Sequence, residues 1–302
     1  SGSSSLALVL LMKHAYMILA HGEPELLQLL LERLDDPRND IYVHLDQKWT
    51  NPPKLATKQA KLFLLTKRVD VRWADVSMLE AEYALFHAVK DSGQSYAYHH
   101  LLSGVDLPIK TQDYIHQFFL ENNGKEFVGI HQHPMSFRAD RALHYWHPFT
   151  RSFRGKGVVF QLKRILRYLI VQVQVLLGLR RNVSISFQKG GQWVSITSNL
   201  VDYLLKHEES VLSCYAGTFG ADEYFIPTLL WNSPFRDRLY CATDECFGAM
   251  RYIGWRSDGR LTAFGSEDLS ELQKTPCLFA RKFDLHDRNF LEKILLLSQP
   301  TP

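Results

Sequence analysis

The sequence predicts an α/β fold in which a mostly parallel central sheet is flanked by helices. Residues 14–20 (HAYMILA) and 39–46 (NDIYVHLD) are apolar or β-branched runs of strand length. The stretch between them, GEPELLQLLLERLDD, has apolar residues at helical spacing. A strand, a helix and a strand within about thirty residues form a βαβ unit, whose two strands are parallel.

The first two helices carry their own start signals. Pro24 stands where the first turn of a helix tolerates proline. Ser77, with Glu80 three residues later, predicts a capping box for a second helix that ends before Gly93.

The alternation of strand and helix continues beyond that point. Residues 96–104 (YAYHHLLSG) predict a strand, and TQDYIHQFFLENNG predicts a helix that runs into Gly124. Farther on, QKGGQWVSITSNLVDYLLKHE predicts a glycine-rich turn, a short strand and a helix capped by Thr197 or Ser198.

Composition places the chain among globular proteins and gives no argument for nucleic acid, so no nucleic-acid partner is expected. Of 302 residues, 46% are hydrophobic and 22% charged, and the net charge is only +3. The charge is unevenly spread, because residues 141–201 contain ten Lys or Arg residues and no Asp or Glu. The excess positive charge is therefore concentrated in this one segment.

Within that segment, residues 155–182 form a mainly apolar pattern that includes Lys163, Arg164 and Arg167. The more common arrangement is a helix whose apolar side packs on the domain and whose cations face solvent. The alternative is a basic amphipathic helix that lies on an anionic membrane surface or on a partner. We expect the first arrangement and keep the second open.

Several common chemistries lack their motifs. The chain has no P-loop, no G-x-G-x-x-G, no G-x-S-x-G and no D-x-D. Glu80 and Glu82 would diverge by about 200° on a helix. His131 and His133 have no evident third ligand, so a metal centre is not expected.

The cysteines and the first residues carry no functional signal. The four cysteines form no C-x-x-C pair, so we expect free thiols: Cys214, Cys241, Cys246 and Cys277. Residues 1–11 are expected to be a tag-like, linker-like or disordered start. A native start near Met12 would leave no signal peptide, which predicts a cytoplasmic protein, peripheral on the inner face of the membrane if the basic segment binds lipid.

Carboxylates near predicted strand ends are the best candidates for chemistry. Asp46 ends one predicted strand and Asp106 follows another, where ligands of open α/β sheets bind. Each could equally be a turn residue that caps local amides. Asp222 and Glu223 follow a Gly-Ala turn and open an apolar run. With nearby cations and aromatic rings, such carboxylates suit transfer of a sugar from an anionic donor.

Six blocks, in this order, give the chain a family resemblance: HAYMILAHGEPELLQLLLERLDDPRNDIYVHLDQK, RWADVSMLEAE, YHHLLSGVDLPIKT, KGGQWVSITSNLVDYLL, ADEYFIPTLLWNSPF and LFARKFD. Together they resemble the core-2/I-branching β-1,6-N-acetylglucosaminyltransferase family, which includes peptide O-xylosyltransferases, from about residue 13 to residue 288. The compact chain is more similar to a bacterial member than to a Golgi member.

The resemblance implies a single GT-A-type domain over residues 12–295. Residues 12–125 would be its nucleotide-binding half, and residues 126–295 its acceptor and catalytic half with the basic segment 155–182. It also implies an inverting transfer, without divalent metal or other cofactor, of a sugar from a UDP-sugar to a glycan hydroxyl. We expect N-acetylglucosamine as the sugar.

The same resemblance assigns roles to residues. Glu223 matches the general base, with Asp222 in support. Lys282 matches the lysine that neutralises the diphosphate, and Arg260, or Arg256 in its place, matches its arginine partner. The other donor-binding positions implied are Asp46, Trp73 and Glu80. The acceptor-binding positions implied are Ser103, Gly104, Asp106, Arg138, Arg141, Trp193, Tyr252 and Trp255.

One departure and two alternatives accompany this prediction. Pro227 lies where the family has a helix-compatible residue, so the helix after Glu223 should start late or kink. One alternative function is UDP-xylose-dependent transfer to a peptide serine. The other is a non-catalytic glycan-binding or scaffold protein, against which Glu223, Lys282 and Asp46 argue, because binding alone needs neither a base nor diphosphate cations.

Overall fold

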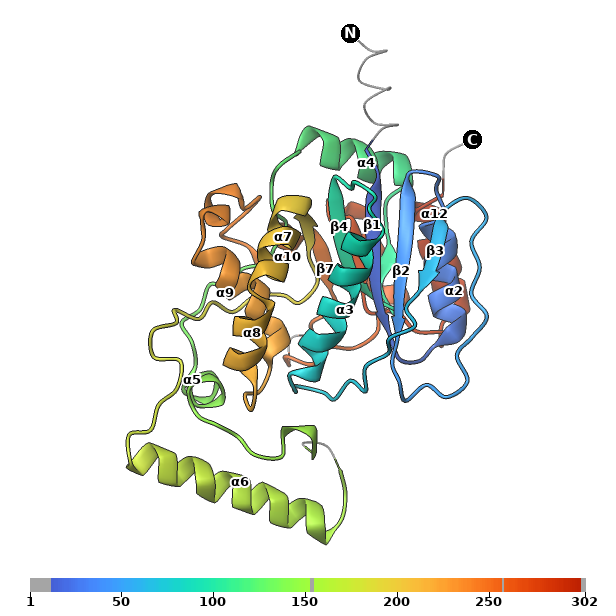
Figure 1. Ribbon diagram of the computed structural model, residues 1–302. Helices are drawn as coiled ribbons and strands as arrows, with labels where there is room; N and C mark the ends of the chain where they lie inside the picture. The colour runs from blue at the N-terminus through green and yellow to red at the C-terminus, as the bar shows by residue number, and fades with distance from the viewer. Residues whose placement is uncertain (1–11, 153–154, 257, 300–302) are drawn as a thin grey trace.

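A five-stranded sheet of order β3-β2-β1-β4-β6 forms the centre of the molecule (Figure 1). The computed structural model describes residues 12–152, 155–256 and 258–299, so the expectation for residues 1–11 lies outside the described residues. The strands are β1 (His14–Ala20), β2 (Asn39–Leu45), β3 (Lys61–Leu64), β4 (Tyr98–Ser103) and β6 (Ser195–Thr197). All neighbouring pairs are parallel except β4 and β6. The expected α/β class with a mostly parallel central sheet is confirmed.

Alternation along β1 explains why both faces of the sheet are covered. Tyr16 and Ile18 point into one hydrophobic cluster, while Ala15 and Met17 point into the other. All four side chains are fully buried. The strand is apolar on both faces, as expected for parallel strands with helices on either side.

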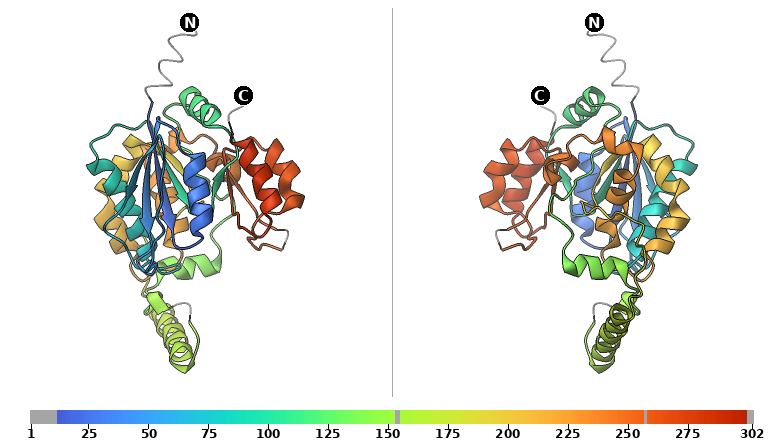
Figure 2. Two further views of the ribbon diagram at one scale, coloured as in Figure 1. Left: turned by 90° about the vertical axis from the view of Figure 1, so that its right-hand side faces the viewer. Right: turned by 90° about the vertical axis from the view of Figure 1, so that its left-hand side faces the viewer.

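Figure 2 shows the two helical layers with the sheet seen nearly edge-on. One layer contains α2 (Pro24–Arg33), α4 (Gln112–Glu121), α11 (Leu269–Lys274) and α12 (Arg288–Leu297). A small sheet of order β5-β8-β7 lies in the same layer, formed by β5 (Leu107–Pro108), β7 (Arg251–Ile253) and β8 (Phe279–Arg281). The other layer contains α3 (Ser77–Asp91), α7 (Ser198–Lys206), α8 (Glu208–Tyr215) and α9 (Phe225–Trp231).

The helix starts agree with the sequence signals in part. The Thr197 side chain accepts from the Leu200 amide and caps α7, as expected. The capping box expected at Ser77 is wrong, because α3 has Val76 at its N-cap position and Ser77 lies inside the helix. The Ser77 hydroxyl instead accepts a hydrogen bond from the Arg72 amide, and the Asp75 carboxylate accepts one from the Ser77 amide. Asp75 is therefore the residue whose side chain accepts a hydrogen bond from a backbone amide of the first turn of α3.

The carboxyl ends of β1, β2 and β4 meet on one side of the sheet. The Asp46 amide donates to Ala20 O at 2.8 Å, and the Gly104 amide donates to Leu19 O at 2.9 Å. A Cβ on Gly104 would lie only 3.0 Å from the Cβ of Ala20, which explains a glycine at this position. The segments that follow β1, β2 and β4 therefore all begin at one edge of the sheet, which we refer to as the carboxyl edge.

Two helices extend beyond the carboxyl edge: α5 (Phe137–His144) and α6 (Val158–Leu176) (Figures 1 and 2). The expectation that α6 packs its apolar side on the domain is wrong, since Val171 is its one buried residue. The helix reaches the rest of the chain through polar side chains instead. None of the helices in the described part of the chain is long and apolar enough to cross a bilayer.

A few short helices complete the described part of the chain. They are α10 (Glu245–Ala249) and four 3-10 helices: η1 (Thr150–Ser152), η2 (Ala221–Glu223), η3 (Pro234–Arg238) and η4 (Ser266–Asp268).

Candidate active site

Glu223 is the last residue of the 3-10 helix η2, directly before α9. Gly220 precedes η2 in the left-handed conformation, with φ 72°, which glycine adopts at little cost. Pro227 is the third residue of α9, in the first turn, where a helix needs no backbone donor. The expected late start is therefore confirmed: the chain breaks between η2 and α9, and Glu223 stands at the break.

The carboxylate of Glu223 is accessible and has a cationic neighbour. Its side chain is 48% exposed, and Glu223 Oε2 lies 3.1 Å from Lys189 Nζ. Burial would lower the pKa of Lys189, but the charge and hydrogen bond of Glu223 outweigh burial and raise that pKa. Lys189 was not predicted from the sequence.

The backbone beside Glu223 is fixed by Gly190. The Gly190 amide donates to Glu223 O at 2.9 Å, and Gly190 also pairs with Ile130 in an isolated antiparallel bridge. A Cβ at Gly190 would lie 1.9 Å from Gly129 O and 2.8 Å from Pro227 Cγ. The Gly-Gly pair in the sequence predicted only a turn, whereas the structure shows a close approach of three segments.

Two further carboxyl groups lie beneath Glu223. Glu82 of α3 is fully buried, accepts from Gln192 Nε2 at 2.8 Å, and has no hydrogen-bond partner for Oε2 among the described residues. Burial, with the Asp222 charge as a smaller cause, raises the pKa of Glu82 well above its usual range. Burial and the adjacent Glu223 charge raise the pKa of Asp222 to about 7. Asp222 is thus a partly buried neighbour of Glu223, and its supporting role stays a prediction.

The predicted donor segment around Trp73 lies against η2. The Gly220 amide donates to Ala74 O at 3.2 Å, and the Thr150 hydroxyl donates to Asp75 Oδ1 at 2.6 Å. The Trp73 side chain is half exposed. Glu80 is exposed, on the same side of α3 as the exposed residue His87. The structure therefore brings the segment of Trp73 next to that of Glu223, but it turns Glu80 to solvent.

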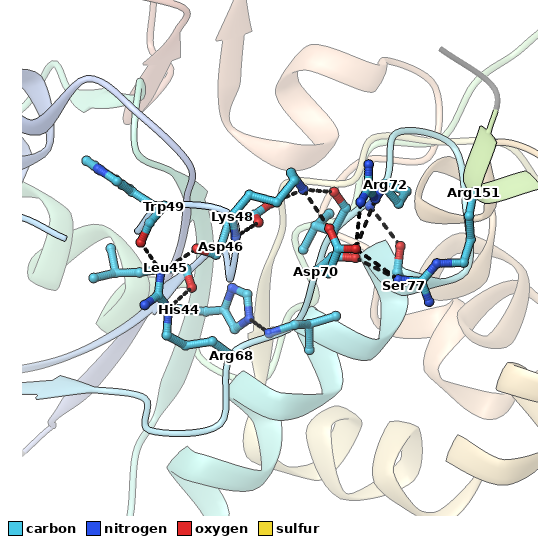
Figure 3. Close-up of polar contacts among 12 residues, drawn as sticks. His44, Leu45, Asp46, Lys48, Trp49, Arg68, Asp70, Arg72, Ser77 and Arg151 are labelled. Carbon is cyan, nitrogen blue, oxygen red and sulfur yellow. Dashed lines mark hydrogen bonds and ion pairs between the residues drawn. The ribbon is translucent and has the colours of Figure 1, made fainter. Parts of the chain in front are cut away.

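Asp46 belongs to an ion-pair network at the end of β2 (Figure 3). Its carboxylate accepts from the Lys48 amide at 2.8 Å and pairs with Lys48 Nζ at 2.8 Å. Lys48 Nζ also lies 3.2 Å from Asp70 Oδ1, and Asp70 pairs in addition with Arg72 and Arg151. The alternative that Asp46 caps a local amide is confirmed, and it does so while it holds a cation at the carboxyl edge.

Arg68 holds the same loop in place through hydrogen bonds to its backbone. Its guanidinium donates to three backbone carbonyls, those of Leu45, Asp46 and Trp49 (Figure 3). His44 Nε2 accepts from the Val69 amide at 2.9 Å, which ties the two loops together. No sequence signal identified Arg68, because its acceptors are main-chain atoms of a loop about twenty residues away.

Three predicted acceptor residues converge on Arg281, which sequence reasoning missed. Asp106 is buried and accepts from the Ser103 amide at 2.9 Å and from Arg281 Nε at 3.0 Å. The Ser103 hydroxyl also donates to Asp106. The Arg281 guanidinium lies 4.7 Å from the ring centroid of Trp193. Ser103, Asp106 and Trp193 are therefore one packed group rather than three independent contacts, and Gly104 lies between the first two.

The cations predicted to bind the diphosphate differ in whether a carboxylate of the protein already pairs with them. Lys282 is half-buried, and within the described residues its ammonium has no ion-pair partner. Arg256 makes a two-pronged pair with Asp268, at 2.7 and 2.9 Å, so it is already neutralised. Arg260 is 80% exposed and pairs with Asp258 of its own turn. Of these three cations, Lys282 is the most available to a ligand.

The remaining predicted acceptor residues do not gather in one place. Arg138 is exposed on α5, while Arg141 donates to Gln172 Oε1 at 2.9 Å and so joins α5 to α6. The Tyr252 hydroxyl donates to Glu271 of α11. Trp255 is 61% exposed. The acceptor role of these four residues stays a prediction.

Metal-ligand and thiol chemistry have few candidates here. Within the described residues, no group of three or more His, Cys, Asp or Glu side chains could hold a metal ion. His131 Nδ1 lies 3.1 Å from Glu245 Oε2, and its ring packs against that of His133. All four cysteines are free thiols, as expected, and the sulfur atoms of Cys246 and Cys277 lie 3.4 Å apart.

Comparison with known families shows which kind of protein carries these residues. A family model described as "Branch: Core-2/I-Branching enzyme" matches residues 14–278. The chain belongs to the Core-2/I-branching enzyme family. The family resemblance inferred from six sequence blocks is thereby confirmed.

Individual relatives of this Core-2/I-branching enzyme are distant but match nearly its whole length. N-acetyllactosaminide beta-1,6-N-acetylglucosaminyl-transferase from Homo sapiens is 24% identical over 295 residues, which cover 90% of this chain and 68% of the human protein. The Mus musculus protein of that name is 24% identical over 294 residues, 90% of this chain and 69% of its own length. Xylosyltransferase 2 from Rattus norvegicus is 22% identical over 295 residues, 91% of this chain but 32% of the rat protein.

Family and relatives together define the enzyme class. The chain is a glycosyltransferase of the Core-2/I-branching family, which takes a sugar donor and a glycan acceptor. The family and its relatives favour an enzyme over the alternative of a purely non-catalytic glycan-binding or scaffold protein.

Proposed function

We propose that this enzyme transfers N-acetylglucosamine from a UDP-sugar to a hydroxyl of a glycan, with inversion at the anomeric carbon and without a divalent metal, on a GT-A-type fold. Glu223 acts as the general base that removes the proton of the acceptor hydroxyl. A single displacement inverts the configuration, so one positioned base suffices and no enzyme nucleophile is needed.

The observation that carries the proposal is the setting of Glu223. Its carboxylate is about half exposed, while the backbone that carries it is fixed by Gly190 on one side and Gly220 on the other. An exposed carboxylate on a fixed backbone can meet a hydroxyl without rearrangement of the chain, which favours catalysis by positioning. Asp222, just before it, is less exposed than Glu223, so it takes the supporting role in this proposal.

The leaving diphosphate would be stabilised by side-chain cations of the protein. Lys282 is half-buried and has no ion-pair partner among the described residues, and Arg260 is exposed in an earlier turn, where it pairs with Asp258. Positive groups aimed at the leaving oxygens lower the barrier in the way that a bound metal would. Asp46 with Lys48, and Trp73 beside η2, would complete the donor side.

Replacement of the base tests the proposal. Glu223→Gln should bind UDP as the unaltered enzyme does and lose transfer by about 10²–10⁴-fold, the usual contribution of a general base. Glu292→Gln, which changes an exposed carboxylate on α12, is the matched control and should keep full activity. Activity of Glu223→Gln within a fewfold of the unaltered enzyme would remove Glu223 from the role of base.

A second candidate is transfer of xylose to a peptide serine, which the similarity to rat Xylosyltransferase 2 favours. Hydrolysis and transfer assays with a panel of UDP-sugars separate the two. Preference for UDP-xylose over UDP-N-acetylglucosamine would select this candidate and leave the role of Glu223 unchanged.

A further inference from the structure

Helix α6 presents its apolar side to solvent. Its apolar stripe consists of Val158, Leu162, Ile165, Leu169, Val173 and Leu176, which are between 52% and 85% exposed. The spacing of four, three, four, four and three residues places all six side chains on one narrow face of the helix. Leu166 and Leu177 widen the stripe on one side, and both are also exposed. So large an apolar face needs an occupant.

The opposite side of α6 holds the helix to the protein through polar and cationic groups. Gln174 accepts from the Trp146 amide at 3.0 Å and donates to Trp146 O at 2.8 Å. The Arg167 guanidinium lies 5.0 Å from the ring centroid of Phe219. These contacts fix the rotation of the helix, so the exposed apolar stripe faces away from the side that contacts the protein. Figure 2 shows α6 standing apart from the rest of the chain.

The charge around the stripe is positive only. Lys156 and Arg164 are exposed at its start and along its flank. Residues 141–201 contain no Asp or Glu, and Asp140, just before them, is already paired with Arg180 at 2.8 Å. Apolar side chains bordered by uncompensated cations fit a surface that is apolar inside and negatively charged outside.

We propose that α6 lies flat on a membrane surface that contains anionic lipid, with the apolar stripe inserted among the acyl chains. Lys156 and Arg164 then face the headgroups. A spanning orientation is excluded, because it would bury the cations in the middle of the helix. A second copy of the chain is a poorer occupant, because two such faces would bring like charges together.

The orientation of the bound enzyme follows from the position of α6. The helix lies beyond the carboxyl edge of the sheet, on the side where β1, β2 and β4 end (Figure 1). Docking through the apolar stripe therefore directs the carboxyl edge toward the headgroups. If the proposed function holds, acceptors carried by the membrane would be presented to Glu223 from that side.

Binding to vesicles tests the inference without any turnover, so its failure is separate from failure of the proposed function. The unaltered chain should co-sediment with vesicles of phosphatidylcholine and phosphatidylglycerol more strongly than with phosphatidylcholine alone, and salt should weaken the binding. The double variant Leu162→Glu/Leu169→Glu should bind the anionic vesicles at least about tenfold more weakly. Circular dichroism should be unchanged, since both side chains are already exposed.

Two controls separate apolar insertion from charge. Gln161→Glu/Gln273→Glu adds the same charge at exposed polar positions, one on α6 and one on α11, and should bind more tightly than the stripe variant. Lys156→Gln/Arg164→Gln should lose about fivefold per removed cation, on anionic vesicles only.

Three results would overturn the inference. They are no binding of the unaltered chain to anionic vesicles, equal losses in the stripe variant and in its charge-matched control, or a dimer in sedimentation velocity that the stripe variant abolishes without any vesicle binding.

Discussion

Lys189 Nζ and Glu223 Oε2 lie 3.1 Å apart, in an ion pair whose side chains are 39% and 48% exposed. Exposed pairs of this kind contribute only about 0–1 kcal/mol to folding. The pair therefore matters for the position of the Glu223 carboxylate rather than for the stability of the fold.

Lys189→Met should separate these two roles. We expect kcat to fall by roughly tenfold, because the carboxylate loses the group that orients it, while the free energy of unfolding changes by less than about 1 kcal/mol. Lys189→Arg keeps the charge and should retain more of the activity. Steady-state kinetics and urea unfolding of both variants provide the measurement. A large loss of stability with unchanged kcat would show that the pair is structural.

Gly190→Ala should disturb the site through the backbone. The new Cβ would lie 1.9 Å from Gly129 O, a contact that no side-chain rotation can relieve, so the segment around Gly190, whose amide donates to Glu223 O, must move. We expect a loss of about 1–3 kcal/mol in unfolding free energy, and a loss of transfer greater than that of Lys189→Met.

Gly191→Ala is the matched control for that variant. The nearest atom to its Cβ would be Glu245 Oε1 at 4.0 Å, so this substitution has room. Similar melting temperatures and activities for the two alanine variants would contradict the close approach at Gly190.

The sequence carried enough information to predict strands β1, β2 and β4 of the central sheet, but not the short edge strand β3. These three strands are apolar, aromatic or β-branched runs of strand length separated by helical periodicity, as expected for parallel strands buried on both faces. The late start of α9 also followed from local chemistry, because Pro227 is tolerated only in a first turn.

Contacts between distant segments were not readable from the sequence. Arg281 meets Asp106 across 175 residues, and Gly190 meets Gly129 and Pro227, so no local pattern marks either contact. The periodicity of the sequence shows that α6 has an apolar side. The same periodicity results whether that side faces the protein or the solvent. The orientation of α6 therefore had to come from the structure.

Asp222 should make stability depend on pH in a defined direction. Burial and the Glu223 charge raise its folded-state pKa to about 7 from the ordinary 3.8. The folded chain thus holds this proton more tightly than the unfolded chain. The stabilisation is complete below about pH 4 and is lost as pH rises toward 7.

Asp222→Asn removes this titration. As the pH is raised from 5 to 8, the free energy of unfolding of the variant should increase relative to that of the unaltered enzyme. The increase should be at most about 1.4 kcal/mol per unit of pKa shift. Urea unfolding at both pH values measures the gain, and Asp91→Asn, at the exposed end of α3, is the control. A difference between variant and parent that is the same at both pH values would contradict the raised pKa of Asp222.

Lys282 should be needed for UDP binding, because of the three predicted diphosphate cations it is the one without a carboxylate partner among the described residues, while Arg256 and Arg260 are both paired. A charge-assisted hydrogen bond contributes about 1.5–3 kcal/mol, so Lys282→Ala should weaken the affinity for UDP by roughly 10–100-fold. Lys274→Ala, on the exposed side of α11, should leave the affinity unchanged.

Calorimetry with UDP, with and without EDTA, measures both the effect of the substitutions and the effect of removing divalent metal. If the proposed metal-independent mechanism holds, the unaltered enzyme should bind UDP equally well in EDTA. Unchanged affinity in Lys282→Ala would remove this lysine from the phosphate site, and a loss of binding in EDTA would show that a divalent ion takes part.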